Sequence, residues 1–339
     1  MRTVVFDRDM IEISIKPTAL LDEYRKLLAE DSRELLKGAL TNIPCPGCLG
    51  KEREQAFNKE GYTYWRCLNC ESIYVSPRPG QEDLDRFYRQ GRASQYWRER
   101  ILQETIDARR IKIIRPRARW VLDALDKYLP FARNGVAVGY HNQLLISELK
   151  LLEHELFPLK VISPIADEEF SELKLDGITI HTGPIDEALG EDDTDVFMFF
   201  DSIDRMADPD TLFQIAARRL VSKGLVLGNA VLASGFDIQN LWERAPSVYP
   251  PERLNLFSVE GLEALFERHD FRTMEFSTPG TFDVEIVRRY VQDHPELEWP
   301  RFMRYLVHHR DDNAMHQLQN YLQQHLLSSF GRFAVTSVK

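Results

Sequence analysis

The stretch GVAVGYHNQLLISELKLLEHEL, residues 135–156, contains the pattern that decides the fold. A short apolar run is followed by a turn and then by apolar residues at helical spacing. Towards the C-terminus, similar short apolar runs alternate with amphipathic segments over about 150 residues. Strands that alternate with helices in this way predict an α/β fold with a mostly parallel, doubly wound sheet.

The same pattern places the individual elements of this region. Helices are expected at 208–220 and 259–269 and again through most of 299–327, while 284–290 is a further apolar stretch and 331–339 is compatible with a closing strand. The runs that predict strands are 135–138, 160–162, 178–181, 195–200, 224–228 and 272–276.

Four cysteines lie upstream of this region, in the pairs CPGC at 45–48 and CLNC at 67–70. A two-residue gap lets both thiolates of a pair turn towards one metal, and the 18 residues between the pairs supply a hairpin. Two disulfides are the alternative, but a chain without a secretory signal rarely keeps them; four unrelated buried cysteines would not fall into matched pairs. The spacing predicts a zinc ribbon with one structural zinc ion, held by Cys45, Cys48, Cys67 and Cys70.

Helices are expected on both sides of the ribbon. Residues 18–38 repeat apolar positions at three and four, and residues 81–129 follow the turn SPRPG with further helical patterns. We therefore divide the chain into an N-terminal helical segment, a ribbon, a helical arm, an α/β domain and a C-terminal helical extension, at 1–40, 41–80, 81–130, 131–290 and 291–339.

The length and the net charge of the chain limit the kinds of partner that it can bind. The chain has 339 residues and a net charge of −10, which repels nucleic acid unless a basic patch overcomes it. The densest basic stretch, 109–119, is more typical of a solvated helix face. Because there is no apolar run of about 18 residues and no signal-like N-terminus, we expect a cytoplasmic protein that binds neither membrane nor nucleic acid.

Several segments in order carry a resemblance to a known family. They are RCLNCESIYVSPRP, LDRFY, ADPDTLF, VYPPERLNLFSVEGLEALFERHDF and STPGTFDVEIV. The chain resembles class I S-adenosylmethionine-dependent methyltransferases of the branch with an N-terminal zinc ribbon. The resemblance implies a Rossmann-like sheet, S-adenosylmethionine as cofactor, and methyl transfer to a sugar or sugar nucleotide in polysaccharide or glycan biosynthesis.

The cofactor motifs of that family are eroded in this chain. The family's glycine-rich turn corresponds to residues 139–143, where only Gly139 remains, followed by Tyr140 and His141; Ala137 replaces the acid before it. After the second strand, the first acid is Asp167. Gly139, Tyr140, His141 and Asp167 are thus candidate residues of a degenerate cofactor site. We predict weak or absent S-adenosylmethionine binding and a loop filled by its own side chains.

The proton acceptors are altered as well. Asp204 and Arg205 stand where the family has a Glu-His pair, and Arg253 stands where a further His is common. Arginine cannot accept a proton, so Asp201 or Asp204 becomes the candidate base. Two arginines in one cleft suit the binding of a phosphate or a carboxylate. The alternative, which the sequence supports equally, is that both arginines form surface ion pairs with nearby acids.

Three functions therefore compete. The first is a sugar methyltransferase with an eroded cofactor site. The second is a catalytically inactive methyltransferase-like protein that serves as a binding or assembly subunit for a protein partner. The third, a zinc-ribbon nucleic-acid binder, is disfavoured by the net charge of −10.

Overall fold

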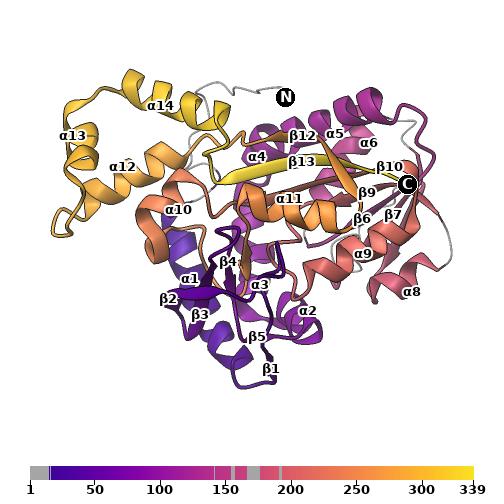
Figure 1. The fold of residues 1–339 in the computed structure, drawn as a ribbon, viewed down its shortest axis with the longest axis horizontal. Helices are drawn as coiled ribbons and strands as arrows, with labels where there is room; N and C mark the ends of the chain where they lie inside the picture. Colours follow the sequence, from indigo (N-terminus) through magenta and orange to yellow (C-terminus); the bar gives the residue numbers. More distant parts are fainter. Residues whose placement is uncertain (1–14, 16, 141, 154–156, 166–175, 191–192) are drawn as a thin grey trace.

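The structure is a computed structural model that describes residues 15, 17–140, 142–153, 157–165, 176–190 and 193–339. Within these residues, the largest sheet has seven strands in the order β12-β13-β10-β9-β6-β7-β8 (Figure 1). The strands β6 to β10 are parallel, whereas β13 is antiparallel to both of its neighbours. The bounds are β6 Gly135–Val138, β7 Leu159–Ile162, β8 Ile178–His181, β9 Thr194–Phe199, β10 Leu220–Val231, β12 Phe271–Ser277 and β13 Phe330–Ser337.

Helices cover both faces of this sheet, which confirms the predicted doubly wound, Rossmann-like α/β fold. Alternate residues of β9 enter different cores, with Phe197 and Phe199 on one face and Val196 and Met198 on the other, as the two-residue period of a strand requires. The first face is covered by α9 (Pro209–Arg219) and α11 (Val259–Arg268), and the second by α5 (Arg115–Tyr128) and α6 (Gln143–Leu152). The short α8 (Ile185–Leu189) precedes β9.

The ribbon forms a second sheet of four strands, in the order β11-β4-β3-β2. Three strands come from the cysteine region, namely β2 (Arg53–Lys59), β3 (Tyr62–Cys67) and β4 (Ile73–Val75). The fourth, β11 (Asn255–Leu256), comes from the α/β domain and pairs antiparallel with β4. A separate two-residue pair joins β1 (Leu40–Thr41) to β5 (Arg78–Pro79). The ribbon is therefore joined by backbone hydrogen bonds to a strand that the α/β domain contributes.

The helical arm links the ribbon to the α/β domain. It begins with α2 (Gln81–Gln90) and continues from residue 92 to residue 128 as a nearly unbroken helix. Helix α1 (Thr18–Leu35) lies against this arm, with Tyr24 and Trp97 in ring contact at 5.4 Å. The pieces of the long helix are α3 (Arg92–Tyr96), η2 (Trp97–Leu102), α4 (Gln103–Arg109), η3 (Arg110–Ile114) and α5.

Three helices are inserted between β12 and β13 and project away from the sheet at the left of Figure 1. They are α12 (Asp283–Asp293), α13 (Arg301–His309) and α14 (Asp312–Gln324), and they pack beside α10 (Phe236–Leu241). The apolar stretch 284–290 lies inside α12. Strand β13 lies within the sheet, between β10 and β12, although its residues belong to the region 291–339. No helix in the described ranges is both long enough and apolar enough to cross a membrane.

Candidate functional site

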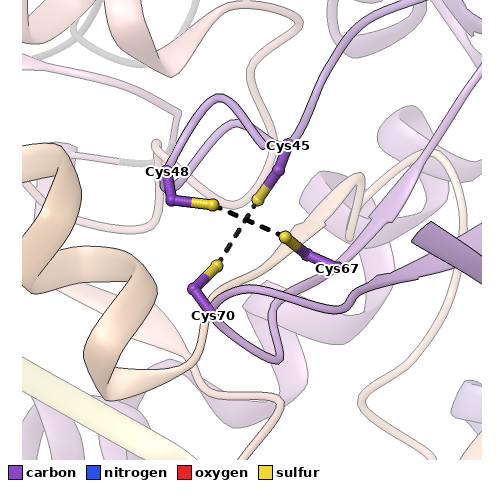
Figure 2. Close-up of side chains that lie close together, drawn as sticks. All are labelled: Cys45, Cys48, Cys67 and Cys70. Carbon is purple, nitrogen blue, oxygen red and sulfur yellow. Dashed lines mark hydrogen bonds between the residues drawn. The ribbon is translucent and has the colours of Figure 1, made fainter. Parts of the chain in front are cut away.

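The four cysteines converge on one point at the edge of the ribbon (Figure 2). The Sγ atoms of Cys45 and Cys70 are 3.6 Å apart and those of Cys48 and Cys67 are 3.5 Å apart. A tetrahedral ZnS₄ site with Zn–S bonds of about 2.3 Å has sulfur atoms about 3.8 Å from one another. Three of the four residues are buried and Cys48 is half-buried. This set of thiols could therefore hold a metal ion.

The cysteine turns are docked on the start of α11. Ser258 caps this helix by accepting a hydrogen bond from Gly261 N at 2.8 Å, and its own N–H donates to Ser72 Oγ at 3.0 Å. A Cβ on Gly261 would lie 2.0 Å from Ser72 Oγ, and one on Gly47 would lie 2.9 Å from the Gly261 carbonyl oxygen. The two glycines thus permit a close approach between the metal-binding turns and the α/β domain.

Arg78 makes a second connection between the ribbon and the α/β domain. Its side chain is 1% exposed and donates to the Val75 carbonyl at 2.8 Å and to Asn255 Oδ1 at 2.7 Å. It also donates to the carbonyls of Ala207 and Leu254, at 3.2 and 3.3 Å. Burial lowers the pKa of Arg78 to about 9, so it remains charged at neutral pH. One guanidinium therefore fixes two loops that carry candidate site residues.

The loop after β6 shows why its single glycine is needed. Gly139 has φ +136°, and a Cβ there would lie 2.6 Å from Ser202 Cβ and 3.0 Å from the Phe200 carbonyl oxygen. Any other residue would clash with the chain that follows β9 and would also adopt a backbone conformation that favours glycine. Packing within the fold is thus sufficient to require Gly139, without reference to a cofactor.

Tyr140 turns inward from the same loop. It is 1% exposed and stacks on Tyr88 of α2, with ring centroids 3.7 Å apart. Its hydroxyl donates to Asp85 Oδ1 at 3.2 Å and accepts from Gln81 Nε2 at 2.9 Å. Burial, reinforced by Asp85, raises the pKa of Tyr140 well above its ordinary value, so the phenol stays neutral. This loop is therefore packed against the helical arm by its own side chain.

Two of the candidate cofactor residues, His141 and Asp167, lie outside the described residues. Ala137, at the position of the missing acid, is buried in the core beneath α5 and α6. Asn142 is also buried and donates from Nδ2 to the Gly139 carbonyl at 3.2 Å, which closes the turn on itself.

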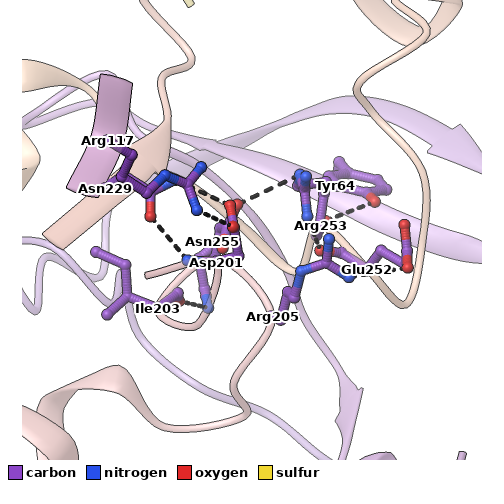
Figure 3. Close-up of polar contacts among 10 residues, drawn as sticks. Tyr64, Arg117, Asp201, Ile203, Arg205, Asn229, Glu252, Arg253 and Asn255 are labelled. Carbon is purple, nitrogen blue, oxygen red and sulfur yellow. Dashed lines mark hydrogen bonds and ion pairs between the residues drawn. The ribbon is translucent and has the colours of Figure 1, made fainter. Parts of the chain in front are cut away.

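Asp201 lies two residues after the end of β9 and has φ +51°, an uncommon conformation for a residue with a side chain. Asn229 of β10 holds both its backbone and its carboxylate, at 2.7 and 3.0 Å. Arg117 of α5 donates to Asp201 Oδ2 at 2.6 Å, and the Asp201 side chain is 32% exposed (Figure 3). Burial opposes ionisation, but Arg117 and Arg205 outweigh it and hold the pKa of Asp201 well below its ordinary range. Asp201 is thus a weak proton acceptor.

Arg205 and Arg253 lie in one polar cluster with acidic partners (Figure 3). Arg205 donates to Glu252 Oε1 at 2.8 Å, and Arg253 Nε is 3.3 Å from Asp204 Oδ2. All four side chains are largely or fully buried, so these are not surface ion pairs. Each arginine already has a carboxylate partner, and a phosphate or carboxylate ligand would have to compete with it.

The pKa values of the two acids paired with these arginines are shifted in opposite directions. Burial raises the pKa of Asp204 despite Arg253 and Arg205, whereas the same two arginines outweigh burial at Glu252 and lower its pKa. Within the described residues, Asp204 Oδ1 and Ser202 Oγ are buried without a hydrogen-bond partner. Of the two candidate bases, Asp201 and Asp204, it is therefore Asp204 whose pKa is better suited to accepting a proton. Its ion pair with Arg253 opposes that role.

Sequence reasoning missed the partners that complete the cluster. Arg117, Asn229 and Glu252 come from a helix, a strand and a loop that are distant in the chain. Arg78 belongs to the SPRP turn and Tyr88 to the segment LDRFY. Neither pattern indicates the distant residues that these side chains contact.

Comparison with known proteins assigns no family to this chain. No family model matches the sequence, and no curated protein matches it. Among solved structures, the plantazolicin methyltransferase BpumL in complex with SAH has a TM-score of 0.47 at 11% identity, covering 76% of this chain and 94% of that chain. A putative sarcosine dimethylglycine methyltransferase from Galdieria sulphuraria has a TM-score of 0.43 at 16% identity, covering 76% of this chain and 99% of that one.

A third similar structure is described by a different reaction. The 4+2 cyclase SpnF has a TM-score of 0.40 at 11% identity, and the match covers 65% of this chain and 80% of that chain. Similarities at this level assign neither a substrate nor a cofactor, so both have to be argued from the residues of this chain.

Proposed function

We propose that this chain is a methyltransferase-like protein whose cofactor site is closed and which acts as a binding or assembly subunit. The observation that carries the proposal is Tyr140, which is 1% exposed and stacked on Tyr88 at the turn where the resembling family approaches its cofactor. A buried ring that is stacked on another ring and hydrogen-bonded at its hydroxyl leaves that position only at the cost of its burial, about 1.5–3 kcal/mol.

Calorimetry with S-adenosylmethionine and S-adenosylhomocysteine tests this proposal directly. We expect no binding of either compound by the full chain, and no rise in melting temperature at millimolar ligand. A ligand at 100 times its dissociation constant stabilises the folded state by about 2.7 kcal/mol, so binding would be visible in both measurements. Micromolar binding of either compound would sink the proposal.

The second candidate is methyl transfer from S-adenosylmethionine to a sugar or sugar nucleotide in polysaccharide or glycan biosynthesis. It is favoured by Asp201, a partly exposed carboxylate at the carboxyl end of β9 that a hydroxyl group can reach. Because the pKa of Asp201 is low, such a reaction would depend on positioning more than on proton removal. Micromolar cofactor binding in the calorimetry would support this candidate.

We further propose that the ion held by the four cysteines is zinc and that its role is structural. Four thiolates form a closed tetrahedral shell that suits zinc and leaves no position for a substrate. When bound, the ion would hold the two cysteine turns in position against α11 and, through them, the loop that carries Glu252 and Arg253. A cytoplasmic location would suit this set of reduced thiols.

A further inference from the structure

Helix α13 presents two aromatic side chains to solvent. Phe302 is 70% exposed and Tyr305 is 51% exposed, whereas Met303 and Val307 face the core. The helix is the outermost of the three inserted helices in Figure 1. Single exposed apolar residues are ordinary, but two aromatics one turn apart on a projecting helix form a small contiguous patch.

The same helix is locally basic on an acidic protein. Residues 301–310 contain Arg301, Arg304 and Arg310 and no acid, while the whole chain has a net charge of −10. Arg310 donates to the Tyr305 hydroxyl at 3.0 Å and lies 4.7 Å from its ring centroid, which holds the ring in place. Arg301 and Arg304 are exposed, and neither forms an ion pair with any residue in the described part of the chain. Aromatic and arginine side chains are enriched where proteins associate.

An acidic segment lies immediately before this helix. Asp293, the last residue of α12, and Glu296 and Glu298 of the connection to α13 are all exposed. In the chain, these exposed acids therefore lie next to the exposed arginines of α13, which also carries the two exposed aromatic side chains, and Asp311 and Asp312 follow the helix. A surface of this kind is complementary to itself after a two-fold rotation, because the acids of each copy then face the arginines of the other.

We propose that α13 and the preceding acidic segment form a symmetric docking surface for a second copy of this chain. The acidic segment of one copy faces Arg301 and Arg304 of the other, and Phe302 and Tyr305 pack near the axis. A partner with only acidic groups, such as an anionic membrane or an acidic peptide, would be repelled by Asp293, Glu296 and Glu298. A second copy provides oppositely charged partners for both the acidic segment and the arginines. This docking surface is independent of the function proposed above.

The size of the surface predicts a weak dimer. A stable interface buries about 800 Å² on each partner, and a helix of nine residues with its connecting segment is a small surface by comparison. Exposed ion pairs contribute little each and are screened by salt, so the aromatic patch should provide most of the affinity. We expect association at micromolar protein concentration that weakens as salt is raised.

Sedimentation velocity of the full chain over a range of concentrations tests the proposal. Phe302→Ser is expected to weaken self-association at least tenfold. Phe131→Ser is the matched control, because Phe131 is 87% exposed but lies after α5, away from the insertion. A chain that stays monomeric at every concentration, or equal effects of the two substitutions, would overturn the proposal.

A charge exchange tests the symmetry of the contact. Arg304→Glu and Glu298→Arg should each weaken self-association several-fold, and an equimolar mixture of the two variants should recover a heterodimer. Both positions are exposed, so unchanged melting curves are expected for the variants. No recovery in the mixture would contradict the two-fold arrangement. Binding of monomeric protein to anionic phospholipid vesicles would instead assign the helix to a membrane surface and overturn the dimer.

Discussion

The cysteine turns and the loop after β6 are both tight turns in which a glycine allows close contact with a neighbouring segment of the chain. The groups at the centre of the two turns are different. In the ribbon, four sulfur atoms surround one point. The Sγ atoms are 3.6 Å apart in the pair Cys45–Cys70 and 3.5 Å apart in the pair Cys48–Cys67, a spacing that suits a metal ion between them. After β6, the ring of Tyr140 packs on Tyr88 and its hydroxyl has two protein partners. The first site could hold an ion from outside the chain, whereas the second is satisfied by the chain alone.

The largest effect is expected from removing one thiol. Cys67→Ser leaves three sulfur ligands, and because structural zinc sites contribute folding energy directly, we expect a loss of more than about 4 kcal/mol in unfolding free energy. Elemental analysis should show zinc in the wild type and little in the variant. Thermal unfolding with and without a chelator measures the stability.

Leu68→Ser is the control for this change, since Leu68 lies between the two cysteines of the same turn and is 46% exposed. It should keep both the metal and most of the stability. Equal metal content in the wild type and in Cys67→Ser would show that the thiols do not form the site.

A smaller effect is expected where the turns meet α11. Gly261→Ala places a Cβ 2.0 Å from Ser72 Oγ, and moving Ser72 breaks its hydrogen bond with the Ser258 N–H. We expect destabilisation of about 1–3 kcal/mol, measured by urea unfolding. Gly80→Ala is the matched control because nothing lies within 4 Å of its Cβ. Similar midpoints for the two variants would mean that the docking of the ribbon tolerates displacement.

The smallest effect separates the two candidate bases by pH. Asp201 has a lowered pKa, so the stability it adds is present above the unfolded value of about 3.9 and is lost as pH falls through the folded value. Asp204 has a raised pKa, so its contribution falls as pH rises from about 3.9 to the folded value.

Unfolding free energies of Asp201→Asn and Asp204→Asn between pH 3 and 7 measure these contributions. The difference between wild type and each variant should be on the order of 1 kcal/mol and should change with pH in opposite directions. Parallel pH profiles would show that the two carboxylates share one environment.

The elements that depend on local pattern were predictable from the sequence. Strand β6 has the bounds expected from its apolar run, and the cysteine spacing led to a set of thiols that could hold a metal. The strands β7 to β10 and β12 lie where short apolar runs occur. In each case the signal is contained within a few residues of the chain, which is why the pattern was sufficient.

Features made by distant residues were not predictable. The pairing of Arg205 with Glu252 and of Arg117 with Asp201 joins residues 47 and 84 positions apart, and no local pattern identifies such partners. Nothing in residues 139–143 shows that Tyr140 would meet Tyr88 of the arm. The position of β13 between β10 and β12 likewise follows from the packing of the sheet, not from its own sequence.

The pairing of β11 with β4 has a consequence for how the chain is made. Strand β4 ends at Val75, but its partner begins at Asn255, so a ribosome working at about 5–20 residues per second supplies that partner roughly 10–40 s later. During this interval the nascent ribbon has an unpaired edge, which is a site for aggregation or for a chaperone. Early capture of a metal ion would order the cysteine turns while the edge waits. In that order of events, capture of the metal would precede docking of the ribbon.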